Sequence, residues 1–194
     1  MSGNDTVGVI HDAPDVVVGL GSTFQGQQAL TQRVIDALSD LPVRALVTLG
    51  EVFEPAAFSA PSHVRVVRAA PHARLFPRAK LVVAHGGHGT VMKALASGVP
   101  LLCIPLGRDQ ADNAARVAHA GAGLRLSRHA RSGQIRHAIG ALLSEPQYQR
   151  AAAALAAELA ELQAADAACW ELESLTRQES RRTARTDDDY GKRL

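Results

Sequence analysis

The fold of this chain is decided by the stretch Leu81-Val-Val-Ala-His-Gly-Gly-His-Gly-Thr-Val-Met-Lys-Ala-Leu-Ala-Ser-Gly-Val-Pro100. Its first four residues are an uninterrupted apolar run, which is typical of a parallel strand covered on both faces. A glycine-rich turn follows, and then a helical window that ends at Ser97-Gly98. Glycines let the backbone turn sharply, and the free N–H groups of a helix start point toward anions. The stretch therefore predicts an anion site, with phosphate as the natural occupant.

A second polar loop follows the next apolar run. Leu101–Ile104 is predicted to be a strand that ends at Pro105, and the loop Gly107-Arg-Asp-Gln-Ala-Asp-Asn113 comes directly after it. A helix is expected from Asp109 to Ala120, with Asp109 or a near neighbour as its N-cap and Gly121 as its stop. Because parallel strands end at the same edge of a sheet, both loops are expected to present polar groups there.

The remaining pattern alternates short β-branched runs with amphipathic windows, as in a doubly wound parallel sheet. The other strands are expected at Val16–Leu20, Val43–Leu49, Val64–Arg68 and, weakly, Gly123–Leu126. Apolar residues at helical spacing predict a helix through Leu30, Val34, Ile35 and Leu38, and another through Ile135, Ile139, Leu142 and Leu143 after a break at Arg131-Ser-Gly133. A long alanine-rich helix is expected beyond Pro146, with Leu155, Leu159 and Leu162 on one side.

Composition narrows the class of protein. The chain has 194 residues, 46% of them hydrophobic, and a formal net charge of +2, which suits one α/β domain and argues against a polycation built for nucleic acid. No window of about 18 apolar residues predicts a membrane span. Cys103 and Cys169 fall in apolar patterns, so we expect two buried thiols in a cytoplasmic protein rather than a disulfide. Residues 1–12 are expected to be a leader, 13–176 the domain, and 177–194 a disordered tail.

The two loops together resemble the nucleotide-sugar signature of GT-B glycosyltransferases, specifically the UDP-glycosyltransferase superfamily and its bacterial macrolide and antibiotic branch. The resemblance rests on His85-Gly86-Gly87-x-Gly89-Thr90, on Gly98-Val99-Pro100, on Asp109-Gln110 with Asn113, and on Gly121-Ala-Gly123. It extends from about Val16 to about Leu175. It implies a Rossmann-like domain that forms the C-terminal, donor-binding half of a GT-B fold.

The resemblance also implies roles for residues. The diphosphate of a nucleotide sugar is expected on Ser22, Thr23, His85, Gly86, Gly87, Gly89 and Thr90, and the hexose on Asp109 and Gln110. Such donors can stabilise the charge left on the diphosphate without a metal. His88 and Asn113 are further candidates for the site. His88 can instead face solvent, His85 can be a turn residue, and Asp109 can be a helix cap.

The nucleoside side is expected to include Pro71, His72 and Lys93, within a segment from Arg68 to Pro77 that is similar to the one framing the base in the family. Two of these residues depart from the family pattern. Lys93 stands where many relatives carry a ribose-binding glutamate, and a lysine cannot accept a hydrogen bond. His72 stands where relatives often have glutamine. The donor therefore stays open between UDP- and dTDP-sugars.

The resemblance covers only the donor half, so the predicted function is hexosyl transfer to a small-molecule acceptor by a domain that lacks its acceptor domain. That domain usually supplies the catalytic base, and no base is assigned here. An acceptor-domain chain is thus an expected partner, while nucleic acid and membrane are not. Alternatives are a non-catalytic nucleotide-sugar-binding module and a GT-B epimerase. A zinc site on His85 and His88 is disfavoured because zinc needs three or four ligands, and no cofactor is expected.

Overall fold

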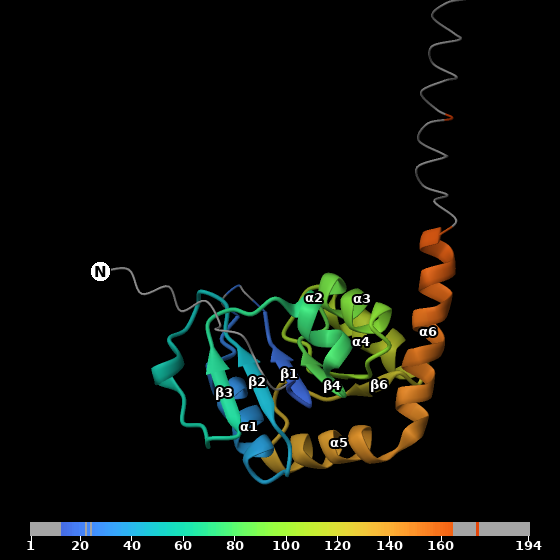
Figure 1. Cartoon of the computed structure of the whole chain (residues 1–194). Helices are drawn as coiled ribbons and strands as arrows, with labels where there is room; N and C mark the ends of the chain where they lie inside the picture. Colours follow the sequence, from blue (N-terminus) through green and yellow to red (C-terminus); the bar gives the residue numbers. More distant parts are fainter. Residues whose placement is uncertain (1–12, 22, 24, 165–173, 175–194) are drawn as a thin grey trace, which may run out of the picture. The chain divides into compact units, whose positions relative to one another are not determined.

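The computed structural model describes residues 13–21, 23, 25–164 and 174. Its centre is a six-stranded, wholly parallel sheet in the order β3-β2-β1-β4-β5-β6 (Figure 1). The strands are β1 (Val16–Gly19), β2 (Ala45–Thr48), β3 (Val64–Val67), β4 (Leu81–Ala84), β5 (Leu101–Cys103) and β6 (Gly123–Arg125). The chain is a doubly wound α/β fold, as predicted.

All six strands lie where the apolar runs predicted them. β4 has the predicted bounds, while the other five end one residue earlier than expected, and β2 also begins two residues later. β1, β2, β4 and β5 are buried along their whole length. The reason is that these four strands carry helices or neighbouring strands on every side, which is why they read as continuous apolar runs.

Helices cover both faces of the sheet (Figure 1). One face carries α1 (Gln28–Ser39) and α5 (Ser132–Ser144), and the other carries α2 (His72–Leu75), α3 (His88–Ala96) and α4 (Gln110–His119). Short 3₁₀ turns, η1 (Pro55–Ala57) and η2 (Phe76–Arg78), and the helix α6 (Pro146–Ala164) complete the described elements. The helix α4 starts one residue later and ends one residue earlier than expected.

The predicted break before α5 is shorter than the sequence suggested. α5 already begins at Ser132, and Arg131 is its N-cap. The side-chain oxygen of Gln134 accepts the backbone N–H of Arg131 at 2.9 Å, which satisfies one donor of the helix start. Gly133 therefore belongs to the first turn of the helix rather than to the loop.

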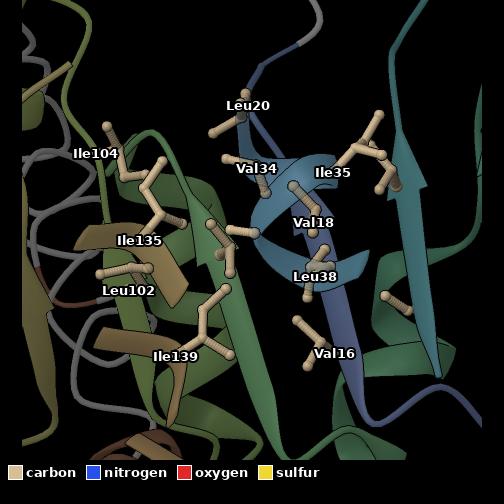
Figure 2. Packing of buried hydrophobic residues seen from close by; sticks show 14 of the residues in the cluster. Val16, Val18, Leu20, Val34, Ile35, Leu38, Leu102, Ile104, Ile135 and Ile139 are labelled. Atoms are coloured by element: carbon tan, nitrogen blue, oxygen red, sulfur yellow. The ribbon is translucent and has the colours of Figure 1, made fainter. Parts of the chain in front are cut away.

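The core on the α1 and α5 face is built from alternate strand residues and one stripe of each helix (Figure 2). Figure 2 shows the side chains of Val16, Val18, Leu20, Val34, Ile35, Leu38, Leu102, Ile104, Ile135 and Ile139 packed together. Every one of these side chains is at most 3% exposed. The helix stripes predicted from their spacing are the stripes that pack, with Leu143 only partly buried at the margin.

The chain divides into two compact units, Met1–Ala156 and Ala157–Leu194, and the division falls within α6. In the second unit, Leu162 is 69% exposed. The expected tail, residues 177–194, lies outside the described residues, as do the expected leader, residues 1–12, and Cys169. No described helix is both long enough and apolar enough to cross a bilayer.

The strand order indicates at which edge of the sheet a ligand would bind. β1 pairs with β2 on one side and with β4 on the other, so the connection after β1 and the connection after β4 leave the sheet in opposite directions. Such a switch point opens a crevice at the carboxyl ends of the strands, which is where ligands bind in open α/β sheets. The crevice of this fold therefore lies between the described part of the loop after β1 and residues 85–87.

Candidate functional site: a cavity at the switch point

A cavity of about 470 Å³ occupies this crevice. Its walls come from the loops that follow β1, β2, β3, β4 and β5, together with the first turns of α3. Of the predicted site residues, the cavity is lined by Thr23, His72, His85, Gly87, His88, Gly89, Thr90, Lys93, Asp109 and Gln110. Residues predicted from separate motifs thus share one cavity, whose volume suits a small-molecule ligand.

Three of the described predicted residues, Pro71, Gly86 and Asn113, do not line this cavity. Ser22 lies outside the described residues. Pro71 is the N-cap of α2, and the Asn113 side-chain amide donates to the carbonyl oxygen of Gly86 at 3.1 Å. This bond ties α4 to the turn after β4. Gly86 and Asn113 therefore support the wall rather than form it.

The glycines of the turn after β4 have different roles. A Cβ on Gly86, whose φ is +86°, would lie 2.8 Å from the carbonyl oxygen of Gln110, so this glycine lets the turn touch the neighbouring loop. A Cβ on Gly87 would instead meet the ring of His85. A Cβ on Gly89 would meet nothing within 4 Å. Of these three glycines, only Gly89 has open space at the position of a Cβ, and a ligand can fill that space.

The start of α3 offers donors to this space. The backbone N–H groups of Thr90 and Val91 bond to the carbonyl of Gly87, at 3.0 and 3.1 Å. The N–H groups of His88 and Gly89, in contrast, have no acceptor within the part of the chain that the structure describes. Free N–H groups at a helix start attract anions, so these two are suited to phosphate oxygens.

His85 lies between the turn and β1. Its Nδ1 is 3.4 Å from the carbonyl oxygen of Gly19. A carbonyl can only accept, so Nδ1 carries the proton and Nε2 is the free nitrogen. Burial lowers the pKa of His85 below its ordinary value, while the Gly19 carbonyl and the charge of Asp109 act in the opposite direction. A neutral Nε2 accepts hydrogen bonds, so His85 must take up a proton before Nε2 can donate to a phosphate.

The loop after β1 is braced by side-chain amides. The side-chain nitrogen of Gln27 donates to the carbonyl of Thr23 at 2.9 Å, and its oxygen accepts the N–H of Gln25. Gln27 is 2% exposed. Arg128 donates to the carbonyl oxygens of both Gln25 and Leu106, at 3.4 and 3.2 Å. The loops after β1 and β5 are therefore held to a common brace, and Thr23 is left on the cavity wall.

The side chain of Gln110 already makes several hydrogen bonds within the protein, which its predicted sugar-binding role does not require. Its side chain is 3% exposed, and its oxygen accepts the N–H groups of Leu106 and Gly107 at 2.8 and 3.2 Å. Its amide nitrogen donates to the side-chain oxygen of Gln25 at 3.3 Å. Its oxygen therefore shapes the loop, and the part of Gln110 left for a ligand is an N–H of the amide.

Asp109 is at the predicted N-cap position of α4, but its carboxylate does not cap the helix. The carboxylate instead accepts the side-chain amide of Asn113 at 2.9 Å and is exposed at the cavity. Asp109 is thus the N-cap residue of α4 by position, as predicted, while its carboxylate bonds to the Asn113 side chain instead of to a helix N–H. A carboxylate with free lone pairs can bind several sugar hydroxyls.

His72 lines the same cavity. The hydroxyl of Thr48 donates to the carbonyl of Val18, so its oxygen accepts the Nε2 proton of His72 at 2.9 Å. The ring of His72 stacks on Phe76, with centroids 5.0 Å apart. Burial and the nearby charge of Lys93 lower its pKa. The remaining nitrogen, Nδ1, is thus a neutral hydrogen-bond acceptor.

Several lining residues were not named individually as site residues, although Arg68, Ala69 and Ala70 begin the segment that was expected to frame the base. These lining residues are Gly19, Gly21, Gln25, Thr48, Gly50, Arg68, Ala69, Ala70 and Arg108. The sequence could have indicated most of these residues, because they follow the end of a predicted parallel strand, where ligands bind in such sheets. Among them, Arg68 forms an ion pair with Glu54.

Among the described ranges, 13–21, 23, 25–164 and 174, no three His, Cys, Asp or Glu side chains are placed to hold a metal ion. Cys103 is a buried free thiol on β5, and burial raises its pKa to about 12.

Fold and cavity together define a Rossmann-like domain of the GT-B type, with its ligand cavity at the topological switch point. The family model for the C-terminal domain of erythromycin biosynthesis protein CIII-like proteins matches residues 32–171. The chain belongs to this family. The resemblance inferred from the glycine-rich turn and the Asp109-Gln110 loop is therefore confirmed.

Known relatives agree with this assignment. The chain is 34% identical over 157 residues to UDP-glycosyltransferase 2 of Phaeomoniella chlamydospora, covering 76% of this chain and 34% of that protein. It is 36% identical over 148 residues to 4'-demethylrebeccamycin synthase of Lentzea aerocolonigenes, covering 76% and 35%. The chain thus spans about a third of the length of these relatives.

Solved structures show the same fold. The structure of spinosyn rhamnosyltransferase SpnG complexed with thymidine diphosphate matches with a TM-score of 0.68 and 26% identity, over 77% of this chain and 42% of that one.

Proposed function

We propose that this domain binds the UDP- or dTDP-activated form of a hexose and presents it for transfer to a small-molecule acceptor. One observation carries the proposal: His85, the free N–H groups of α3 and the carboxylate of Asp109 line a single cavity at the switch point of the sheet. A related solved structure holds thymidine diphosphate, and a curated relative is named as a UDP-glycosyltransferase, which supports both donor nucleotides.

The residues divide the donor between them. The protonated ring of His85 and the N–H groups of His88 and Gly89 bind the diphosphate, with Thr23 and Thr90 as hydroxyl donors. Asp109 accepts the hydroxyl groups of the hexose. At the other end, Nδ1 of His72 accepts from the nucleoside, and Lys93 balances the charge of the phosphates. These donors are in place before the sugar leaves, so they can stabilise the negative charge that the diphosphate acquires.

The partner in this proposal is an acceptor-binding domain, which holds the acceptor hydroxyl and removes its proton. Positioning and general-base assistance are both large terms, the latter typically worth about 10²–10⁴-fold. We infer that donor binding is a property of this domain, while multiple turnover needs the partner. The free thiol of Cys103 is in keeping with a cytoplasmic setting.

Calorimetry with UDP and dTDP, in buffer containing EDTA, tests the donor site. Both nucleotides should bind, and His85→Ala should weaken binding by about 10–150-fold, since a hydrogen bond to a charged group contributes about 1.5–3 kcal/mol. His119→Ala removes an exposed histidine that does not line the cavity and is the matched control. Equal affinity in the His85 variant and the wild type would remove His85 from the site.

Mass spectrometry tests the transfer step. The purified chain is incubated with UDP- and dTDP-hexoses and a panel of phenolic, polyketide and lipid acceptors, with and without an added acceptor domain. A hexose adduct is expected only when the acceptor domain is present. Multiple turnover by the chain alone would refute the need for a partner. Donor binding without an adduct in either arm would favour a non-catalytic nucleotide-sugar-binding module.

A further inference from the structure

Arg108 has a backbone conformation that its side chain does not favour. Its φ is +57°, and it is the only non-glycine residue with a positive φ in the described part of the chain. The left-handed region is disfavoured for residues with a Cβ and is easily adopted by glycine. The neighbouring Gly107 has no such φ, and a Cβ on it would meet nothing within 4 Å. The loop thus has arginine where its backbone favours glycine.

The side chain of Arg108 is exposed on the cavity wall. It makes no hydrogen bond or ion pair with any residue that the structure describes, so no such bond among the described residues offsets the strain of its backbone. Residues held in such conformations are concentrated at functional sites. The observation points to a ligand as the missing partner of this guanidinium.

The charges around the cavity indicate which part of a ligand the guanidinium of Arg108 would bind. Asp109 is the only carboxylate among the described lining residues, and its charge acts on His85. A carboxylate so close to the phosphate side would repel a diphosphate unless a neighbouring cation offsets it. Arg68 is paired with Glu54, and the charge of Lys93 acts on His72 at the nucleoside end. Arg108 is the cation adjacent to Asp109.

We propose that Arg108 binds the diphosphate of the nucleotide sugar and offsets the charge of Asp109 beside it. The proposal rests on the proposed function, since it assigns one more residue to the same ligand. Arginine suits this role because its planar fork of donors matches phosphate oxygens, and because its charge does not depend on pH.

Calorimetry of Arg108→Ala, Arg108→Lys and wild type with uridine and UDP tests the assignment. Arg108→Ala should weaken UDP by about 5–30-fold and leave uridine unchanged, and the lysine variant should recover part of the loss. Arg78→Ala, which removes an exposed arginine that does not line the cavity, is the control for net charge and should change UDP affinity by less than about twofold. Unchanged UDP affinity in Arg108→Ala would overturn the proposal.

Two further ligands distinguish a contact of Arg108 with the diphosphate from a contact with a sugar carboxylate. UDP-hexose and UDP-hexuronate should lose affinity in Arg108→Ala by the same factor as UDP, and a loss confined to the hexuronate would assign Arg108 to a sugar carboxylate and overturn the diphosphate assignment. If wild type binds neither UDP nor dTDP, the proposed function fails together with this inference. If wild type binds both and only the Arg108 comparison fails, the proposed function stands.

Thermal unfolding tests the strain separately from binding. Arg108→Ala keeps a Cβ in the left-handed region, whereas Arg108→Gly removes it, so the glycine variant should melt about 1–3 °C above the alanine variant while binding UDP equally weakly. A glycine variant that melts no higher than the alanine variant would overturn the premise that the backbone favours glycine there.

Discussion

Gly87→Ala should disable the candidate diphosphate site through His85 rather than through the fold. Gly87 has φ −63° and ψ 137°, which alanine adopts without strain. An added Cβ, however, would lie 3.0 Å from Cε1 of His85 and closer still to Nε2. Both distances are shorter than an ordinary van der Waals contact of 3.4–4 Å. The ring must therefore move, and its bond from Nδ1 to the Gly19 carbonyl, already 3.4 Å long, is lost.

The magnitude follows from the contact that His85 is proposed to make. Losing one hydrogen bond to a charged group costs about 1.5–3 kcal/mol, which corresponds to about 10–150-fold in the affinity for UDP. The fold should lose about 1 kcal/mol or less, because the change replaces a glycine at a helix N-cap. Calorimetry measures the first quantity and urea unfolding the second. Gly140→Ala, at an open position in α5, is the matched control and should leave the affinity for UDP unchanged.

A double-mutant cycle excludes a direct clash between the new methyl group and the ligand. If Gly87→Ala acts by displacing His85, the substitution should add almost nothing to the loss already caused by His85→Ala. Full additivity of the two losses, or wild-type affinity in Gly87→Ala alone, would refute this reasoning.

Three further predictions concern the same loops. Gly86→Ala should destabilise the domain by about 1–3 kcal/mol in urea unfolding, because φ is +86° and the Cβ would lie 2.8 Å from the backbone oxygen of Gln110; an unchanged midpoint would contradict this. UDP affinity should rise as pH falls below about 6.5, since burial lowers the pKa of His85 in the free protein and a bound diphosphate raises it. The stability of the free domain should fall over the same pH window, because the unfolded chain binds the proton more readily; an affinity that is flat with pH would refute proton uptake by His85. Asp109→Ala should weaken UDP-hexose but not UDP, whereas Gln110→Ala should lower the melting temperature, because its oxygen holds two loop N–H groups; the reverse pattern would exchange their roles.

The strands and the helix stripes could be read from the sequence because burial alone selects them. β4 was predicted with its bounds, and the stripe of Leu30, Val34, Ile35 and Leu38 is the one that packs on the sheet. A strand buried on both faces must be apolar throughout, and a surface helix must bury one stripe. Such local requirements leave a mark on neighbouring residues, so a pattern in one dimension is enough to predict them.

The family and the location of the site could also be predicted, because the motif after β4 combines several local requirements in a fixed order. The turn must contain glycine, a helix must follow, and the loop after the next strand must be polar. The sequence did not indicate which contact requires each glycine of this turn. Gly86 meets the backbone of Gln110, which is 24 residues further along the chain, and Gly87 meets the ring of His85.

The sequence by itself thus determined the class of fold, the family, and the edge of the sheet where the site lies. Only the tertiary structure decided how the site residues share the work: that the oxygen of Gln110 is used by its own loop, that His72 donates to Thr48, and that Arg108 lies on the cavity wall with a positive φ. The physical reason is that these roles depend on contacts between loops from different strands. Such contacts exist only after the parallel sheet has brought the loops to one edge, and no periodic pattern encodes them.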